Sequence, residues 1–180
     1  MTTHGVMLCA PLLALLAWAA TIDLRSRRIP NWLTFSLVIS GLAVNGIGIG
    51  PASGGSAFLG FLVGFTLPLV LFLLGALGGG DVKLLAGVGA WMGPETVFKV
   101  FLIAALVGAV IVLAQSLAQR RTKILLRNSA VLAMNLAHVG DVGVDHVRET
   151  GQAARSVDRP LPYAVPVLIA MTLLVARSWR

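Results

Sequence analysis

Residues 78–85 read Gly-Gly-Gly-Asp-Val-Lys-Leu-Leu, and the apolar runs on either side of them decide the fold. One run covers residues 57–77 and the next begins at Leu84, so Asp81 stands directly after three glycines at the edge of apolar sequence. An acid at such a place is costly to desolvate and is a candidate functional residue by default. Glycines, which lack a Cβ atom, allow another helix or an extended backbone to come close to it. A glycine-rich loop that ends in a solvated aspartate is the plain alternative.

The chain as a whole is far more apolar than an ordinary soluble domain. Of its 180 residues, 57% are hydrophobic and 12% are charged, and the mean hydropathy is +0.90. These values predict an integral membrane protein in contact with the lipid bilayer, with a single domain over residues 1–180. The net charge of +7 fits the basic loops of a membrane protein, so no nucleic-acid partner is expected. One cysteine, Cys9, and three histidines without ligand-like spacing predict no metal site.

Six apolar runs predict an all-α protein, a polytopic bundle of about six transmembrane helices. About 20 apolar residues suffice to cross a bilayer, and most of the runs approach that length. The expected spans are residues 6–21, 33–50, 57–77, 83–93, 97–117 and 160–177, with a cytoplasmic loop over 118–159. The fourth run is short, so we expect neighbouring helices to shield it. Pro30 and Asn31 predict a turn with Asn31 as the next N-cap, and residues 122–138 predict a helix on the membrane surface.

The basic residues predict which ends of the spans face the cytoplasm. Arg25, Arg27 and Arg28 follow the first span, and most of the 14 Lys and Arg residues fall in stretches on the same side. Asp23 ends the first span and Asp81 ends the third, and two crossings return the chain to the face it left. We therefore expect a multi-pass protein of the cell inner (plasma) membrane, with both aspartates at its cytoplasmic edge.

Asp23 and Asp81 are the acidic residues that stand at apolar edges on one face. Glu95 falls on the opposite face, and the charged loop holds Asp141, Asp145, Glu149 and Asp158. Two carboxylates in a partly desolvated site cannot both ionise cheaply, so such a pair holds one proton near neutral pH. The ionised member can take a proton from water while the protonated member polarises a carbonyl. This is the chemistry of aspartic-type peptide hydrolysis.

The residues by themselves leave two other interpretations open. Asp23 can pair with Arg25 or Arg27 at a helix end, and Asp81 can pair with Lys83, in which case both acids are structural. Paired acids at a membrane edge also fit a small proton-coupled transporter or a non-enzymatic membrane scaffold. A peptidase needs both carboxylates and no ion gradient, whereas a proton relay responds to the gradient.

Three stretches in combination resemble the type IV prepilin peptidases, which are membrane aspartic proteases of the GxGD class. They are residues 23–31 (DLRSRRIPN), residues 78–85 (GGGDVKLL) and residues 161–164 (LPYA), which open the last span. The resemblance implies that Asp23 and Asp81 are the catalytic pair. It also implies supporting roles for Gly78, Gly80, Lys83 and Asn31.

The same resemblance implies a hydrolase that needs no cofactor and cleaves the basic leader from prepilins or pilin-like proteins at the cytoplasmic face. Larger bacterial members carry an amino-terminal methyltransferase portion with cysteine pairs, and this sequence has neither the length nor the cysteines for it. It is therefore similar to the short, peptidase-only members that serve Tad or Flp pili, and archaeal preflagellin peptidases are related. Ala164 stands where the family pattern has glycine, which affects the packing expected of the last span. Nothing in the resemblance implies an oligomeric state.

Overall fold

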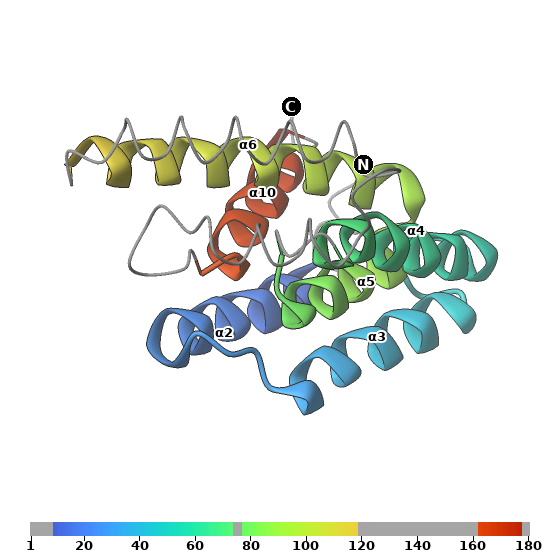
Figure 1. Cartoon of the computed structure of the whole chain (residues 1–180). Helices are drawn as coiled ribbons and strands as arrows, with labels where there is room; N and C mark the ends of the chain where they lie inside the picture. The colour runs from blue at the N-terminus through green and yellow to red at the C-terminus, as the bar shows by residue number, and fades with distance from the viewer. Residues whose placement is uncertain (1–8, 74–76, 119–161, 178–180) are drawn as a thin grey trace, which may run out of the picture.

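Helices make up the regular secondary structure of the described part of the protein, which comprises residues 9–73, 77–118 and 162–177 of the computed structural model (Figure 1). The helices are α2 (Ala10–Ser26), α3 (Asn31–Gly46), α4 (Gly54–Leu73), α5 (Gly79–Met92), α6 (Pro94–Ala118) and α10 (Ala164–Arg177). Each corresponds to one of the expected spans, so the predicted all-α bundle is confirmed. The expected loop over 118–159, with its surface helix over 122–138, lies almost wholly outside the described residues.

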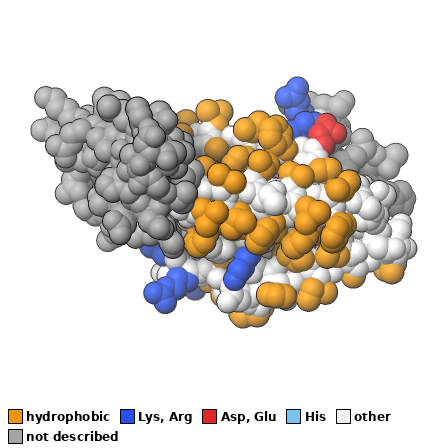
Figure 2. Space-filling model, turned by 45° about the vertical axis from the view of Figure 1, so that its right-hand side comes forward, with side chains coloured by type: hydrophobic (Ala, Val, Ile, Leu, Met, Phe, Trp, Pro, Cys, Tyr) orange, Lys and Arg blue, Asp and Glu red, His pale blue; other side chains and the backbone are white. Residues whose placement is uncertain are grey.

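Two of the described helices are long and apolar enough to cross a membrane. They are α4 and α6, which each contain an 18-residue stretch of high mean hydropathy, 2.2 in α4 and 2.8 in α6. Large hydrophobic side chains lie on the outside of the bundle, and Figure 2 shows them spread across one face. Examples are Phe35, Ile39, Phe58, Leu106 and Val110. An apolar exterior of this extent is expected where lipid or another protein surrounds it.

The short helix α5 lies between α3 and α4 and is enclosed along most of its length (Figure 1). Val82 and every residue from Leu84 to Trp91 are buried. Gly89 of α5 faces Gly60 of α4, and a Cβ atom on either glycine would collide with the backbone of the other. Small residues at a helix contact let the two backbones approach closely. The expectation that neighbouring helices shield this short helix is confirmed.

The carboxyl end of α5 is held to α3 by a buried amide. Asn45 of α3 is 1% exposed, and its Nδ2 atom donates hydrogen bonds to the carbonyl oxygens of Ala90 at 2.9 Å and Trp91 at 3.0 Å. Its Oδ1 atom accepts a bond of 2.8 Å from the N–H of Ala52 in the turn after α3. A buried amide with partners for donor and acceptor fixes the helices it joins. One end of α5 is thus anchored, and Asp81 is at the other end.

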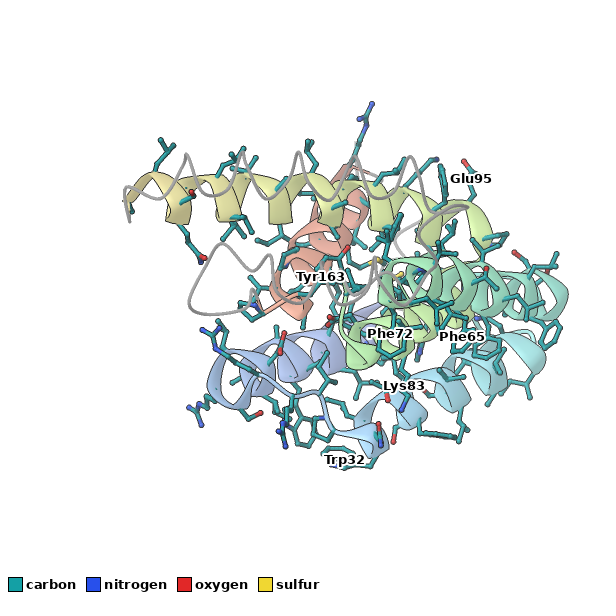
Figure 3. All side chains as sticks on the ribbon, viewed as in Figure 1. Trp32, Phe65, Phe72, Lys83, Glu95 and Tyr163 are labelled. Atoms are coloured by element: carbon teal, nitrogen blue, oxygen red, sulfur yellow. The ribbon has the colours of Figure 1, made fainter. Side chains whose placement is uncertain are left out.

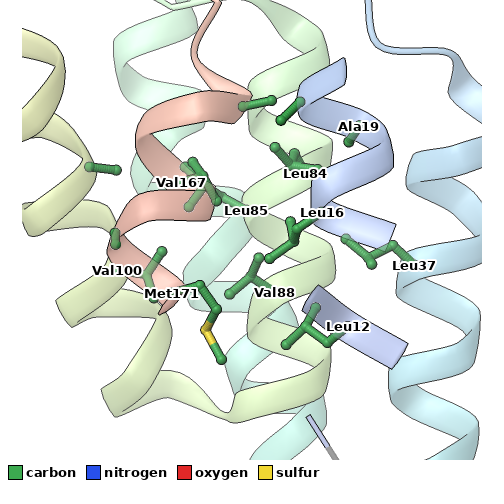
Figure 4. Packing of buried hydrophobic residues seen from close by; sticks show 14 of the residues in the cluster. Leu12, Leu16, Ala19, Leu37, Leu84, Leu85, Val88, Val100, Val167 and Met171 are labelled. Atoms are coloured by element: carbon green, nitrogen blue, oxygen red, sulfur yellow. The ribbon is translucent and has the colours of Figure 1, made fainter. Parts of the chain in front are cut away.

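A hydrophobic core joins α10 to the rest of the bundle (Figure 4). Leu16 from α2, Leu85 from α5, Val100 from α6 and Val167 from α10 are all fully buried in it. Burial of a side chain of this size contributes about 1.5–3 kcal/mol relative to its exposure to water. The core therefore sets α10 against α2 and α6 and brings its first residue beside the end of α2.

One local prediction is wrong at the turn between α2 and α3. α2 continues past residue 21, and Arg27, which has a φ of 52°, ends it by donating its N–H to the carbonyl oxygen of Asp23 at 2.9 Å. Asn31 does not cap α3, because Pro30 occupies the N-cap position and no side chain bonds to the first amides. The Asn31 oxygen instead accepts a charge-assisted hydrogen bond from Lys83, a stronger interaction than a bond to a neutral amide.

Candidate active site

Asp23 lies near the end of α2 and is buried, with 6% of its surface exposed. Its Oδ2 atom accepts a hydrogen bond of 3.1 Å from the backbone N–H of Ala164, the first residue of α10. The first amides of a helix have no partners inside the helix and favour an anion. The fold thereby joins the end of the first described helix to the start of the last one, 141 positions away in the sequence.

Asp81 lies in the first turn of α5, so the glycines before it open a helix and do not form a separate loop. Gly78 is the N-cap, and its N–H donates a hydrogen bond of 3.1 Å to Asp81 Oδ2. A Cβ atom on Gly78 would lie 3.0 Å from the same oxygen, so glycine leaves room for the carboxylate to fold back over the helix start. In a capping box, an acidic side chain at the third helix position accepts a hydrogen bond from the N-cap N–H. Asp81 makes this bond with Gly78, and the bond orients its side chain.

The supporting residues of the two motifs meet beside Asp81. A Cβ atom on Gly80 would lie 3.3 Å from the Cβ of Ile29, in the turn between α2 and α3. Lys83 Nζ donates a hydrogen bond of 2.9 Å to Asn31 Oδ1, and Figure 3 shows Lys83 between α5 and α3. The sequence left an ion pair of Lys83 with Asp81 open. Lys83 instead bonds to Asn31 and ties the start of α5 to the start of α3.

Burial and nearby charges set the protonation of the two aspartates, both of which lie outside the expected membrane spans. Burial raises the pKa of Asp81 to about 7, with a further contribution from the charge of Asp23 and an opposing one from the Gly78 N–H. Burial also raises the pKa of Asp23, while the hydrogen bond from Ala164 and the charge of Arg27 lower it. Asp81 therefore keeps its proton more readily near neutral pH, and the pair can hold one proton between them.

Tyr163 adds a phenol to the same site. Its side chain is 9% exposed, and Asp81 is the charged group that acts on it electrostatically. Figure 3 shows Tyr163 at the start of α10, one residue before the amide that binds Asp23. Within the described ranges the Tyr163 hydroxyl has no hydrogen-bond partner. Both aspartates and this hydroxyl are therefore gathered around the first turn of α10.

The structure brings together the residues that the sequence singled out. The charge of Asp23 acts on Asp81. Of the four supporting residues, Gly78 bonds to Asp81, Gly80 packs against the turn between α2 and α3, and Lys83 bonds to Asn31. The contributions of Tyr163 and of the Ala164 N–H were not foreseen. The LPYA stretch at residues 161–164 was the signal that pointed to this segment, but it says nothing about which atoms face the aspartates. In the described part of the chain, no three His, Cys, Asp or Glu side chains lie together as metal ligands would.

Comparison with known proteins places the chain in a family. Residues 10–113 match the type IV leader peptidase family, a region that includes both aspartates and ends before α10. A prepilin leader peptidase/N-methyltransferase of Burkholderia pseudomallei (strain 1026b) is 42% identical over 111 residues, which cover 58% of this chain and 34% of that protein. The protein of the same name from Aeromonas hydrophila is 38% identical over 106 residues, which cover 53% of this chain and 36% of that protein.

An archaeal protein shows the same similarity over a shorter stretch. A preflagellin peptidase of Methanocaldococcus jannaschii is 42% identical over 76 residues, which cover 40% of this chain and 32% of that protein. The chain thus spans about a third of the length of these curated relatives. No solved structure matches it. Because the family match extends over more than half of the chain and contains both aspartates, the chain belongs to the type IV leader peptidase family.

Proposed function

We propose that the chain is a membrane aspartic endopeptidase that removes the amino-terminal leader from prepilins or pilin-like proteins, with Asp23 and Asp81 as its catalytic pair. The observation that carries the proposal is the coupling of two carboxylates from distant parts of the sequence, one of which has its pKa raised to about 7. The names of the relatives, prepilin leader peptidase and preflagellin peptidase, support the reaction and the class of substrate.

The surroundings of the two aspartates support different roles for them in the proposed hydrolysis. Asp23 accepts a hydrogen bond from the Ala164 N–H and is stabilised by the positive charge of Arg27, and both interactions favour its ionised form. It therefore takes a proton from the attacking water. Asp81 holds a proton and donates it toward the oxygen of the scissile carbonyl as the water oxygen bonds to the carbon. The tetrahedral intermediate then collapses. Asp23 gives its proton to the leaving amine, and Asp81 recovers a proton from the intermediate.

We further propose a multi-pass arrangement in the cytoplasmic membrane, with the site on the cytoplasmic face. The exposed apolar exterior of the bundle and the two membrane-length helices support insertion. Arg25 in the last turn of α2, and Arg27 and Arg28 in the turn after it, are all exposed, which supports the orientation through the excess of basic residues on the cytoplasmic side. Helix α5 has 14 residues and is roughly 21 Å long, shorter than a hydrocarbon core of about 30 Å.

Leader removal tests the proposal directly. The chain is co-expressed with a Flp-type prepilin, the substrate class we propose to test first, and cleavage is followed by a shift on a gel for wild type, Asp23→Asn and Asp81→Asn. Asn keeps the size of the side chain but can act neither as the acid nor as the base. The rate of leader cleavage should therefore fall at least 1,000-fold in each variant, on the order of the loss when a group essential to the chemistry is removed. Glu95→Gln is the matched control, because Glu95 is exposed on α6 and Figure 3 shows it far from Tyr163 and Lys83.

The outcomes separate the enzyme from its alternative. If either aspartate variant cleaves at the wild-type rate while present in the membrane, the catalytic pair is wrong. A proton-coupled transporter remains the second candidate, because an acid with a pKa near 7 at an apolar edge also fits a proton relay. Adding an uncoupler that collapses the proton gradient decides between them. Peptide cleavage should be unchanged, whereas transport would stop.

A further inference from the structure

The Tyr163 hydroxyl is a buried polar group without a hydrogen-bond partner in the described part of the protein. Leaving such a group unpaired costs about 1–3 kcal/mol, so unpaired buried hydroxyls are uncommon and call for an explanation. Tyr163 is placed next to the two carboxylates and not in a remote part of the core. The residue after it binds Asp23, and Asp81 is the charge that acts on its side chain.

The first turn of α10 therefore presents two donors to two acids. One donor, the Ala164 N–H, is already bonded to Asp23 Oδ2 at 3.1 Å. The other donor is the Tyr163 O–H. Once Asp81 has given its proton to the scissile carbonyl, a phenol bonded to its carboxylate makes a short, charge-assisted hydrogen bond, which is about twice as strong as one between neutral groups. Asp81 lies in the first turn of α5, and its side chain is held from one side by the N–H of Gly78.

We propose that Tyr163 is a positioning residue that donates a hydrogen bond to the Asp81 carboxylate that forms when Asp81 gives its proton to the substrate. α10 then holds both carboxylates, Asp23 through a backbone amide and Asp81 through a phenol. The phenol keeps its own proton throughout, so no covalent step is added to the hydrolysis. The proposal rests on the proposed peptidase function and adds to it a residue that acts through Asp81.

Tyr163→Phe removes the hydroxyl and keeps the ring that fills the core. A hydrogen bond to a charged group is worth about 1.5–3 kcal/mol, so kcat for leader cleavage should fall roughly 10- to 100-fold. KM should stay near the wild-type value, because the hydroxyl does not contact the substrate. The melting temperature in detergent should be unchanged or higher, because the resting structure loses only an unpaired polar group.

Ser116 provides the matched control. It is the other buried side-chain hydroxyl without a partner in the described ranges, and it lies near the end of α6. Ser116→Ala should therefore leave kcat at the wild-type value and leave the melting temperature unchanged or higher. If both hydroxyls were ordinary core imperfections, Tyr163→Phe and Ser116→Ala would behave alike.

Each result of the Tyr163→Phe measurement decides the proposal. A lower kcat with unchanged KM and an undiminished melting temperature supports it. Cleavage within threefold of wild type overturns it, and so does a raised KM at unchanged kcat, which would assign the hydroxyl to substrate binding. A fall in both kcat and melting temperature also overturns it, since the hydroxyl would then be bonded in the resting fold. Wild type and Asp81→Asn are measured in the same assay. If wild type itself does not cleave, the proposed function has failed and not this inference.

Discussion

Replacing Asp81 with Asn should stabilise the protein while it abolishes cleavage. In the folded protein the pKa of Asp81 is raised from 3.8 to about 7, mainly by burial, so folding favours its protonated form. The unfolded chain ionises near 3.8, and between these two values the folded state binds more protons. The contribution of Asp81 to stability is therefore full below about pH 4 and is lost as pH rises through about 7. An amide does not titrate and avoids this loss.

The size of the effect follows from the two pKa values. At about 1.36 kcal/mol for each pKa unit, the ionisation penalty removed by Asp81→Asn is at most ~4 kcal/mol at pH 8 and falls to ~2 kcal/mol at pH 5. The amide oxygen of Asn can still accept the Gly78 N–H, so the local hydrogen bond is kept. For a chain of this size, ~4 kcal/mol corresponds to a rise in melting temperature of roughly 10 °C.

The assay is thermal unfolding in mild detergent, followed by circular dichroism at pH 5 and pH 8. Part of the pKa rise comes from the charge of Asp23, so the stability gain of Asp81→Asn should be smaller in an Asp23→Asn background. Glu95→Gln is the control, because Glu95 is exposed and its pKa is lowered by Lys99, so it does not titrate between pH 5 and 8. A variant less stable than wild type at pH 8, or an equal gain at both pH values, would refute the reasoning.

Two further predictions concern how α5 is held. Gly89→Ala should sharply reduce the amount of folded protein in the membrane, because its Cβ would collide with the Gly60 backbone. Gly55→Ala should be tolerated, because there is open space at its Cβ. The yield after detergent extraction and the size-exclusion profile measure both effects. Lys83→Met and Asn31→Ala should each lower the rate of leader cleavage by about 3- to 10-fold. The double variant should cleave no more slowly than the poorer single variant, because both substitutions remove the same hydrogen bond. Losses that multiply in the double variant would contradict this prediction.

The helices and their order were predictable because a helix in an apolar run is a local feature. Runs of hydrophobic residues ended by glycine, proline or charge set the six spans, and each corresponds to a helix with ends shifted by a few residues. Helix α2 continues past the expected end of the first span at residue 21 and includes Asp23. The N-cap at Asn31 was wrong because the competing partner, Lys83, is far away in the sequence.

The order of residues along the chain was enough to predict which residues form the site. Asp23 and Asp81 stand at the edges of apolar runs with two expected crossings between them, so we could expect both on one side. The GGGD and DLRSRRIPN stretches then pointed to the family. These inferences use only the order of residues along the chain, which is why they needed no structure.

Only the tertiary structure decided how the two aspartates differ. The packing of α10 against α2 supplies Asp23 with the Ala164 amide and brings Tyr163 within electrostatic reach of Asp81. Packing of the helices also buries Asp81 and brings the charge of Asp23 near it, and both effects raise the pKa of Asp81. Each of these effects depends on the distance between atoms far apart in the sequence. Burial, hydrogen bonding and charge act through space, so their sum at a carboxylate becomes known only when the helices are packed.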